Sequence, residues 1–579
     1  MLRLLPLLLL FSSTLRTCSG GGGVTPVQLF IQCFSKAAHA PNLLALPNTA
    51  SFNSVLFSSF QNQRFLLSPD AVKPSLIVSA SNESHVQAAV SCARVADLGI
   101  RTRSGGHDYE GMSNTAARSV TGGNAPFITL DISALRSISF DAALATAWVQ
   151  AGATVGEIYY AIGKKSDTLA FPAGICPTTG LGGHFSGGGI GPLTRKFGLS
   201  ADNILDARIV DAQGRLLDRK AMGEDLFWAI RGAGSAGFGV AVAFKIRLVS
   251  IPPVVTTFNV VKTLRQNATG LVARWEEIAH EFDTNLFVRV IAQASKESDG
   301  TGTIQITFNS FYLGRLEELL AVALRSFPEL GLTAADCTER SWLESTLFFN
   351  GDAGKPTETF LDRKQATNSS FKGKSDFVKV PIGGGGLEKI WWFMMEAAIE
   401  EPMVLILEPF GGKMSEIGED AIAFPHRKGN LYNIQYFMRW FETEEAAIQK
   451  HLEWMRKLYA FMAPYVSGEP RAAYYNYKDI DLGRNVEGKG TTYSSAKVWG
   501  EKYFKAATAA TQARDRPHGS RRRSSLPHPC DRERSRPALR PTTAMTRGRA
   551  LAGDLTAGQA PATTSVCGRL PSRLAAAYP

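Results

Sequence analysis

The stretch RSGGHDYEG (residues 103–111) follows a short run that is typical of a β-strand. A second stretch, GICPTTGLGGHFSGGG (residues 174–189), is denser still in glycine. Glycine lets backbone N–H groups approach an anion such as a diphosphate closely, but each glycine costs conformational entropy on folding. Two such loops therefore predict a flat ligand that is held against the backbone.

A third glycine-rich stretch, GAGSAG (residues 232–237), matches the Gly-x-Gly-x-x-Gly dinucleotide fingerprint. The fingerprint requires a strand before it and a helix after it. Here a helix-like segment (residues 225–230) precedes it and a strand follows, so we do not expect a Rossmann-type nicotinamide site. The sequence also lacks a Gly-x-Ser-x-Gly elbow and a phosphate-binding loop, which disfavours a hydrolase and an NTPase.

The order of expected strands and helices divides the chain into parts. Between residues 76 and 250, strands alternate with amphipathic helices, and the pair Pro252-Pro253 then marks a boundary. Beyond it we expect strands at 258–261, 286–292, 303–311, 403–408 and 431–440, and helices at 271–280, 316–327 and 444–462. This pattern predicts an antiparallel sheet covered by helices. The fold class is therefore α+β.

The two ends of the chain differ from its body. Residues 1–23 combine a basic start, a short apolar run and a small-residue exit, which predicts a signal peptide; a buried N-terminal strand is the alternative. Residues 506–579 carry 13 Arg against 4 Asp plus Glu, hence +9 of the net charge of +11. This tail shows no apolar period, which predicts either a disordered basic segment or translation out of frame. The body is nearly neutral, so we expect no nucleic-acid partner, and no membrane span.

The expected secretion bears on the state of the cysteines. Cys33 and Cys92 both lie in helical patterns near the start of the chain, and secretion would favour a disulfide between them. Three glycosylation sequons, at Asn82, Asn267 and Asn368, agree with that route. No Cys-x-x-Cys or His-Glu-x-x-His motif occurs, so we expect no metal site.

Further motifs appear in order along residues 28–505: ADNI (201–204), WAIRGAG (228–234), FPHR (424–427), YYNYKDIDLG (474–483) and WGEKYF (499–504). Together with the two glycine loops, they resemble the plant berberine bridge enzyme-like (reticuline oxidase-like) flavoproteins of the PCMH-type FAD-binding superfamily. The resemblance implies an FAD-binding domain at 28–251, a substrate-binding domain at 252–475, and a C-terminal return to the FAD domain at 476–505.

The resemblance also implies how the cofactor is held. It predicts FAD attached twice, through His107 to the 8α-methyl group and through Cys176 to C6 of the flavin. The other implied cofactor-binding residues are Arg103, Ser104, Gly105, Gly106, Gly111, Thr179, Gly180, Gly182, Gly183, His184, Gly187, Gly188 and Val240.

The implied reaction is oxidation of an alcohol-type group on a carbohydrate, monolignol or alkaloid by hydride transfer to the flavin, which O₂ or another acceptor reoxidises. The resemblance gives Tyr109, Asn433, Gln435 and Tyr477 as the candidate catalytic residues, because a base must lie within hydrogen-bond reach of the hydroxyl. It further implies a monomer secreted to the apoplast or cell wall.

Three positions depart from the family pattern. Ile190 stands where many relatives have a Tyr or Phe that lines the site, and an isoleucine cannot take a proton. Thr179, three residues after Cys176, replaces the Val or Leu that often lies on the dioxygen path. After residue 505 the family's closing segment is replaced by unrelated sequence. The alternative prediction is therefore a non-catalytic or misfolding product of a family gene.

Overall fold

The computed structural model describes residues 24–68, 71–117, 126–364, 369–397, 403–484 and 492–505. The expected signal peptide (1–23) and basic tail (506–579) lie outside the described residues, as does Asn368.

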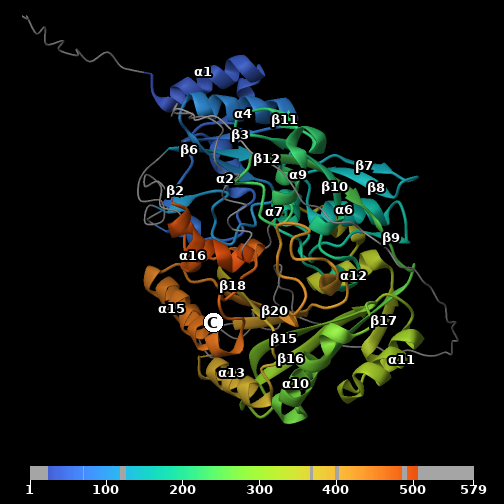
Figure 1. Ribbon diagram of the computed structural model, residues 1–579. Coiled ribbons are helices and arrows are strands. Elements are labelled where there is room, and N and C mark those ends of the chain that lie inside the picture. Colours follow the sequence, from blue (N-terminus) through green and yellow to red (C-terminus); the bar gives the residue numbers. More distant parts are fainter. Residues whose placement is uncertain are drawn as a thin grey trace, which may run out of the picture.

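Two small sheets form the N-terminal part of the molecule (Figure 1). The first has the strand order β1-β3-β6-β4, and its β3/β6 and β4/β6 pairs are parallel. The second has the order β11-β10-β12-β8-β7 and is antiparallel. Their strands are β1 Leu44–Ala45, β3 Leu76–Ser79, β4 Gly99–Arg103, β6 Phe127–Asp131, β7 Ile138–Asp141, β8 Thr146–Gln150, β10 Ile204–Val210, β11 Leu216–Leu217 and β12 Val240–Arg247. Two short pairs, β2 Ala71–Val72 with β5 Ala116–Ala117 and β9 Leu169–Ala170 with β13 Val249–Ser250, complete this part.

Helices cover these sheets. The helix expected at 82–98 is α4 Glu83–Val95, and the side chain of Asn82 caps it by accepting a hydrogen bond from the N–H of His85. The others in this part of the chain are α1 Pro26–Ala38, α2 Ala50–Phe57, α3 Arg64–Leu67, α6 Val155–Gly163, α7 Leu181–Ser186, α8 Thr194–Phe197 and α9 Arg219–Ala229.

The predicted disulfide is present. Cys33 of α1 and Cys92 of α4 are bonded, with their Cα atoms 5.6 Å apart. We expect the Cys33→Ser/Cys92→Ser variant to lose about 2–5 kcal/mol of unfolding free energy, because the bond restricts the unfolded chain. Denaturant midpoints of the variants measure this loss. Either single substitution should cost nearly as much as both together, and an unchanged midpoint in the double variant would contradict the prediction.

A seven-stranded antiparallel sheet forms the second part, in the order β17-β14-β16-β15-β19-β20-β18. Every strand expected here from the sequence is found. The strands are β14 Val255–Thr263, β15 Leu286–Lys296, β16 Gly302–Tyr312, β17 Cys337–Arg340, β18 Ser370–Val378, β19 Met403–Pro409 and β20 Tyr432–Trp440. The sequence analysis missed β17 and β18.

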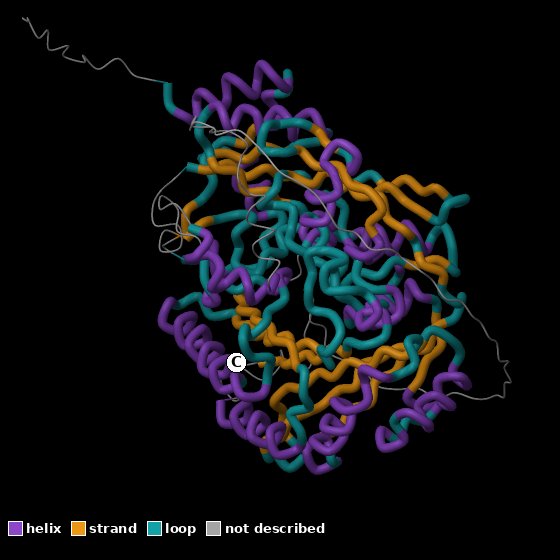
Figure 2. The backbone as a smooth tube through the Cα atoms, viewed as in Figure 1, coloured by secondary structure: helices purple, strands orange, loops and turns teal. Residues whose placement is uncertain are grey.

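One face of this sheet is covered by helices, as predicted (Figure 1). These helices are α10 Ala268–Ile278, α11 Leu316–Ser326, α13 Gly384–Ala397 and α15 Glu445–Phe461. The opposite face turns toward the N-terminal sheets, with α12 Trp342–Asn350 and the short α14 Lys413–Glu416 at the junction. Figure 2 shows that loops fill the middle of the molecule, between the two sets of sheets.

The C-terminal return ends in α16 Tyr493–Phe504. Tyr503 and Phe504 pack with Ala233 of the third glycine stretch and with Ala473. The end of α16 thus contacts the N-terminal part of the chain. No helix in the described ranges has the length and apolar character needed to cross a bilayer.

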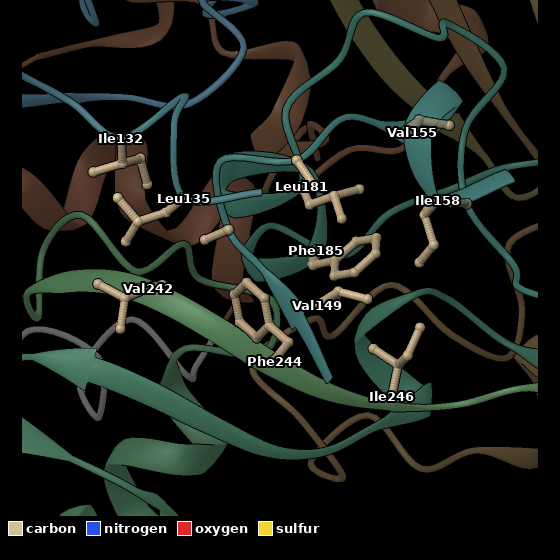
Figure 3. Packing of buried hydrophobic residues seen from close by; sticks show 14 of the residues in the cluster. Ile132, Leu135, Val149, Val155, Ile158, Leu181, Phe185, Val242, Phe244 and Ile246 are labelled. Carbon is tan, nitrogen blue, oxygen red and sulfur yellow. The ribbon is translucent and has the colours of Figure 1, made fainter. Parts of the chain in front are cut away.

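The second glycine stretch is anchored by apolar side chains. Its middle is the short helix α7 rather than an open loop, because Leu181 and Phe185, four residues apart, are both buried on one side. Figure 3 shows these two side chains packed among Val149 of β8 and Phe244 of β12. The rings of Phe185 and Phe244 lie 5.7 Å apart. This packing fixes the loop relative to the sheet.

Candidate active site

A cavity of about 280 Å³ lies where the glycine loops meet the seven-stranded sheet. Its walls come from regions that are far apart in the sequence: Gln61, residues 104–113, 174–191 and 234–236, the inward face of the sheet, and residues 474–478. Within the described part of the chain, no group of three or more His, Cys, Asp or Glu is arranged to hold a metal ion.

The two predicted glycine loops contact each other directly. A Cβ added to Gly105 would lie 2.3 Å from the amide nitrogen of Gly180, and one added to Gly180 would lie 2.2 Å from that of Gly105. Gly106 has a φ of +71° and lies against the carbonyl of Ser59. Side chains at these positions would separate the loops, so part of the glycine content serves loop–loop packing.

His107 lies at the junction of the loops with hydrogen-bond partners for both ring nitrogens. Its Nε2 is 2.8 Å from Gln61 Nε2 and 2.9 Å from Thr178 Oγ1, while Nδ1 is 3.3 Å from Thr179 Oγ1. Burial, with the nearby His184, lowers the pKa of His107 to about 3. The imidazole is therefore neutral at physiological pH and keeps a nucleophilic lone pair.

Cys176 also lines the cavity, in the loop that faces His107. Its sulfur takes part in a disulfide. A sulfur in that bond cannot also bond to another group, so any further chemistry at Cys176 requires the thiolate form.

His184 closes the second loop on itself. Its Nε2 accepts a hydrogen bond of 2.8 Å from the N–H of Gly174, and burial lowers its pKa to about 4. The ring is thus neutral and its acceptor nitrogen is already in use. A Cβ at the adjacent Gly183 would meet nothing within 4 Å, so the cavity is open over this part of the loop.

Three of the four predicted catalytic residues meet on the opposite wall. Gln435 Nε2 donates to Tyr109 Oη at 2.6 Å, and the rings of Tyr109 and Tyr477 stack with centroids 5.3 Å apart. Phe371 and Phe437 pack against the Tyr109 ring. Burial raises the pKa of both phenols above the usual value of 10, so they are protonated hydrogen-bond donors at neutral pH.

Asn433, the fourth predicted residue, does not line the cavity. It lies on the same face of β20 as Gln435, as the spacing predicted, but it is fully buried. Among the residues that the structure describes, neither its amide nitrogen nor its amide oxygen has a hydrogen-bond partner. In the register of the sheet it stands directly opposite Glu408 of β19.

The predicted cofactor-binding residues divide into two groups. Those that line the cavity are Ser104, Gly105, Gly106, His107, Cys176, Thr179, Gly180, Gly183 and His184. Those that do not are Arg103, Gly111, Gly182, Gly187, Gly188 and Val240. Arg103 is fully buried and binds Asp131 and the carbonyls of Val55 and Leu56, and Val240 begins β12 within the apolar core.

Several residues of the wall were missed from the sequence. The third glycine stretch contributes Gly234, Ser235 and Ala236, so its glycines do serve the site, although not as a Rossmann fingerprint. Ile190 lines the cavity as expected. The charged residues Asp108, Arg289, Glu408, Arg439 and Lys478 also line it. Asp108 and Lys478 lie within motifs found in the sequence, whereas no motif marked Arg289, Glu408 or Arg439.

Comparison with known proteins identifies the cofactor and the family. Residues 74–219 match a family model described as an FAD binding domain. Berberine bridge enzyme-like 23 of Arabidopsis thaliana is 51% identical over 447 residues, which are 77% of this chain and 81% of that protein. Monolignol oxidoreductase AtBBE-like 13 of the same plant is 47% identical, covering 79% and 84%. The structure of Phl p 4, a grass pollen allergen with glucose dehydrogenase activity, matches with a TM-score of 0.78 at 40% identity, covering 84% of this chain and 96% of that one.

An FAD-binding domain joined to a helix-covered antiparallel sheet, with a cavity at their junction, defines an FAD-linked oxidoreductase of the PCMH type. The site fits FAD, because a flat ring system has open space over Gly183 and a neutral imidazole beside it. The chain belongs to the berberine bridge enzyme-like family.

Proposed function

We propose that this protein holds FAD through covalent bonds from His107 and Cys176 and oxidises an alcohol-type group of a small molecule. The observation that carries the proposal is the facing arrangement of the two loops, which places both residues on one cavity opposite Tyr109, Gln435 and Tyr477. Bound FAD supplies the acceptor for the hydride that leaves the alcohol carbon.

The chain's own residues prepare the substrate. The protonated phenols of Tyr109 and Tyr477 donate hydrogen bonds to the substrate oxygen, and Gln435 fixes the orientation of Tyr109. The rings of Phe371 and Phe437 support this wall and keep bulk water away from it. This surface accepts the hydroxyl of a carbohydrate, a monolignol or an alkaloid, with O₂ or another acceptor reoxidising the flavin.

Two further features belong to this proposal. The Cys33–Cys92 disulfide is of the kind that persists in an oxidising compartment, which supports secretion to the apoplast or cell wall. We also propose that the enzyme is a monomer. The hydroxyl of Thr179 contacts His107, so this side chain lies beside the proposed attachment point.

The test is anaerobic bleaching of the flavin. The secreted protein is mixed without oxygen with cinnamyl alcohol, glucose, cellobiose or a benzylisoquinoline alcohol, and absorbance near 450 nm is followed. We expect at least one of these compounds to bleach the flavin, and its derivative O-methylated at the reacting hydroxyl to leave the flavin yellow, because the methylated oxygen has no proton to release. Yellow protein that none of the compounds bleaches would contradict the proposed reaction.

A further inference from the structure

We infer that Glu408 of β19 is the catalytic base that takes the proton from the substrate hydroxyl. This inference rests on the proposed alcohol oxidation and assigns a step within it. The alternation of β19 places Ile406 and Glu408 on the face that lines the cavity, while Leu405 and Leu407 are buried in the helix-covered core. The Glu408 carboxylate therefore belongs to the reaction cavity.

The other ionisable groups of the wall are poor bases. Tyr109 and Tyr477 remain protonated because burial raises their pKa, and burial raises the pKa of Tyr474 to about 12. The acceptor nitrogen of His184 is used by Gly174, and His107 is assigned to the cofactor. Gln435 and Asn433 are amides, which do not take up a proton at neutral pH.

Asp108 is the second carboxylate of the wall, and its environment differs from that of Glu408. Its Oδ2 lies 3.1 Å from Lys478 Nζ, and its Oδ1 accepts hydrogen bonds from the N–H groups of Glu110 and Met112. These contacts hold the pKa of Asp108 below its usual value despite its burial. A carboxylate stabilised in this way is a weak proton acceptor.

Glu408 has none of these stabilising contacts. It is only 8% exposed, and among the described residues no side chain or backbone group donates a hydrogen bond to its carboxylate. Burial raises its pKa, while the charge of Arg289 on the neighbouring strand β15 partly opposes that shift. A carboxylate with free lone pairs and a raised pKa has the properties of a general base.

The groups around Glu408 support this role. The negative charge of Glu408 contributes to the raised pKa of Tyr109, Tyr474 and Tyr477. Glu408 therefore lies near the phenols proposed to hold the substrate oxygen. Arg289 faces it from β15, and Arg439 lines the same cavity from β20. Asn433 stands directly opposite, with an amide N–H that has no acceptor and is available to orient the carboxylate.

The step balances as follows. The O–H bond of the alcohol breaks and its proton passes to a carboxylate oxygen of Glu408, while the hydrogen on the alcohol carbon leaves with its electron pair for the bound FAD. The carbon–oxygen bond becomes a carbonyl. The alcohol is thereby oxidised by two electrons and FAD is reduced by two, with one proton held on Glu408.

The test compares Glu408→Gln and Glu408→Asp with a matched control, Glu416→Gln, whose side chain is exposed on α14. In the wild type the rate of anaerobic flavin reduction should rise with pH through the pKa of Glu408 and then level off, because only the ionised carboxylate accepts a proton. Glu408→Gln should reduce this rate by about 10²–10⁴-fold and remove that pH dependence, with flavin content unchanged. Glu408→Asp should retain part of the rate, and Glu416→Gln all of it.

A second measurement does not depend on turnover. Protonated Glu408 can donate a hydrogen bond to a carbonyl oxygen, so the affinity for cinnamaldehyde, measured by calorimetry, should fall as pH rises through the Glu408 pKa. In Glu408→Gln the amide donates at every pH, so the affinity should be constant. If the wild-type protein oxidises no alcohol, the proposed function fails, while the measurement of aldehyde binding still tests Glu408. A Glu408→Gln variant with wild-type rates, or with the wild-type pH dependence of aldehyde binding, would overturn the inference.

Discussion

The His107→Ala/Cys176→Ala variant is expected to release all of its flavin when it is denatured, whereas the wild-type protein keeps the flavin bound. His107 offers a neutral imidazole and Cys176 a sulfur on the same cavity, and the proposal assigns one covalent bond to each. The measurement is the colour of an acid-precipitated, washed pellet. The wild-type pellet should be yellow, and that of the double variant colourless.

Single variants make this test sharper. His107→Ala and Cys176→Ala should each keep a yellow pellet, because one bond suffices to hold the flavin. His184→Ala is the matched control: this buried histidine lines the same cavity, but its ring nitrogen is bound to the backbone of Gly174, so its pellet should stay yellow. A yellow pellet from the double variant would show that the attachment residues lie elsewhere.

Mass spectrometry distinguishes a Cys176 that is bonded to flavin from a Cys176 that is in a disulfide. A thioether to flavin survives treatment with a thiol reductant, whereas a disulfide is cleaved by it. We expect the reduced peptide that contains Cys176 to retain the mass of the flavin. A peptide that reverts to the unmodified thiol would leave His107 as the single attachment point.

The sequence located this site well because its strongest signals are backbone requirements. Gly105 and Gly180 must be glycine for the loops to meet, so the pattern and the cavity coincide. Arg103, in the same motif, does not line the cavity. It binds Asp131 and backbone carbonyls and so stabilises the loop. A motif marks a structural unit without separating the residues that touch the ligand from those that hold the loop.

Two charged residues of the cavity wall, Arg289 and Glu408, could not be predicted from a sequence motif. Glu408 is a single acidic residue near the end of an apolar strand, and Arg289 lies in an apolar strand too. Such patterns are typical of a strand whose polar side faces solvent. Arg289 and Glu408 are buried because the N-terminal part of the molecule packs over this face of the seven-stranded sheet. No local sequence pattern predicts that packing.

Strand β18 was missed for a related physical reason. Its sequence, SFKGKSDFV, contains two lysines, a glycine and an aspartate, and β-propensity disfavours that composition. Lys372 and Lys374 are nevertheless almost fully buried, because acidic residues from other segments surround them. Lys372 binds Glu110 of the first glycine loop and Asp479 of the C-terminal return, and Lys374 binds Asp481.

Replacing Lys372 by methionine is expected to lower the unfolding free energy by about 3–5 kcal/mol, because the buried carboxylates of Glu110 and Asp479 each lose one of their two cation partners. Glu110 would keep Arg64, at 2.7 Å, and Asp479 would keep Lys374, so the fold should form but with lower stability. Glu110 immediately follows Tyr109, and Asp479 follows Tyr477 by two residues. Loss of Lys372 should therefore also loosen the wall of the cavity that bears both phenols.

Denaturant unfolding of the purified variant measures the loss of unfolding free energy. The matched control is Lys389→Met, because Lys389 is exposed on α13. The control should change the unfolding free energy by no more than about 0.5 kcal/mol. Adding Glu110→Gln to Lys372→Met should restore part of the loss, because it removes the charge of one of the two buried carboxylates that lose the Lys372 ammonium. Equal stability of Lys372→Met and the control would mean that the three segments are held together by apolar packing alone.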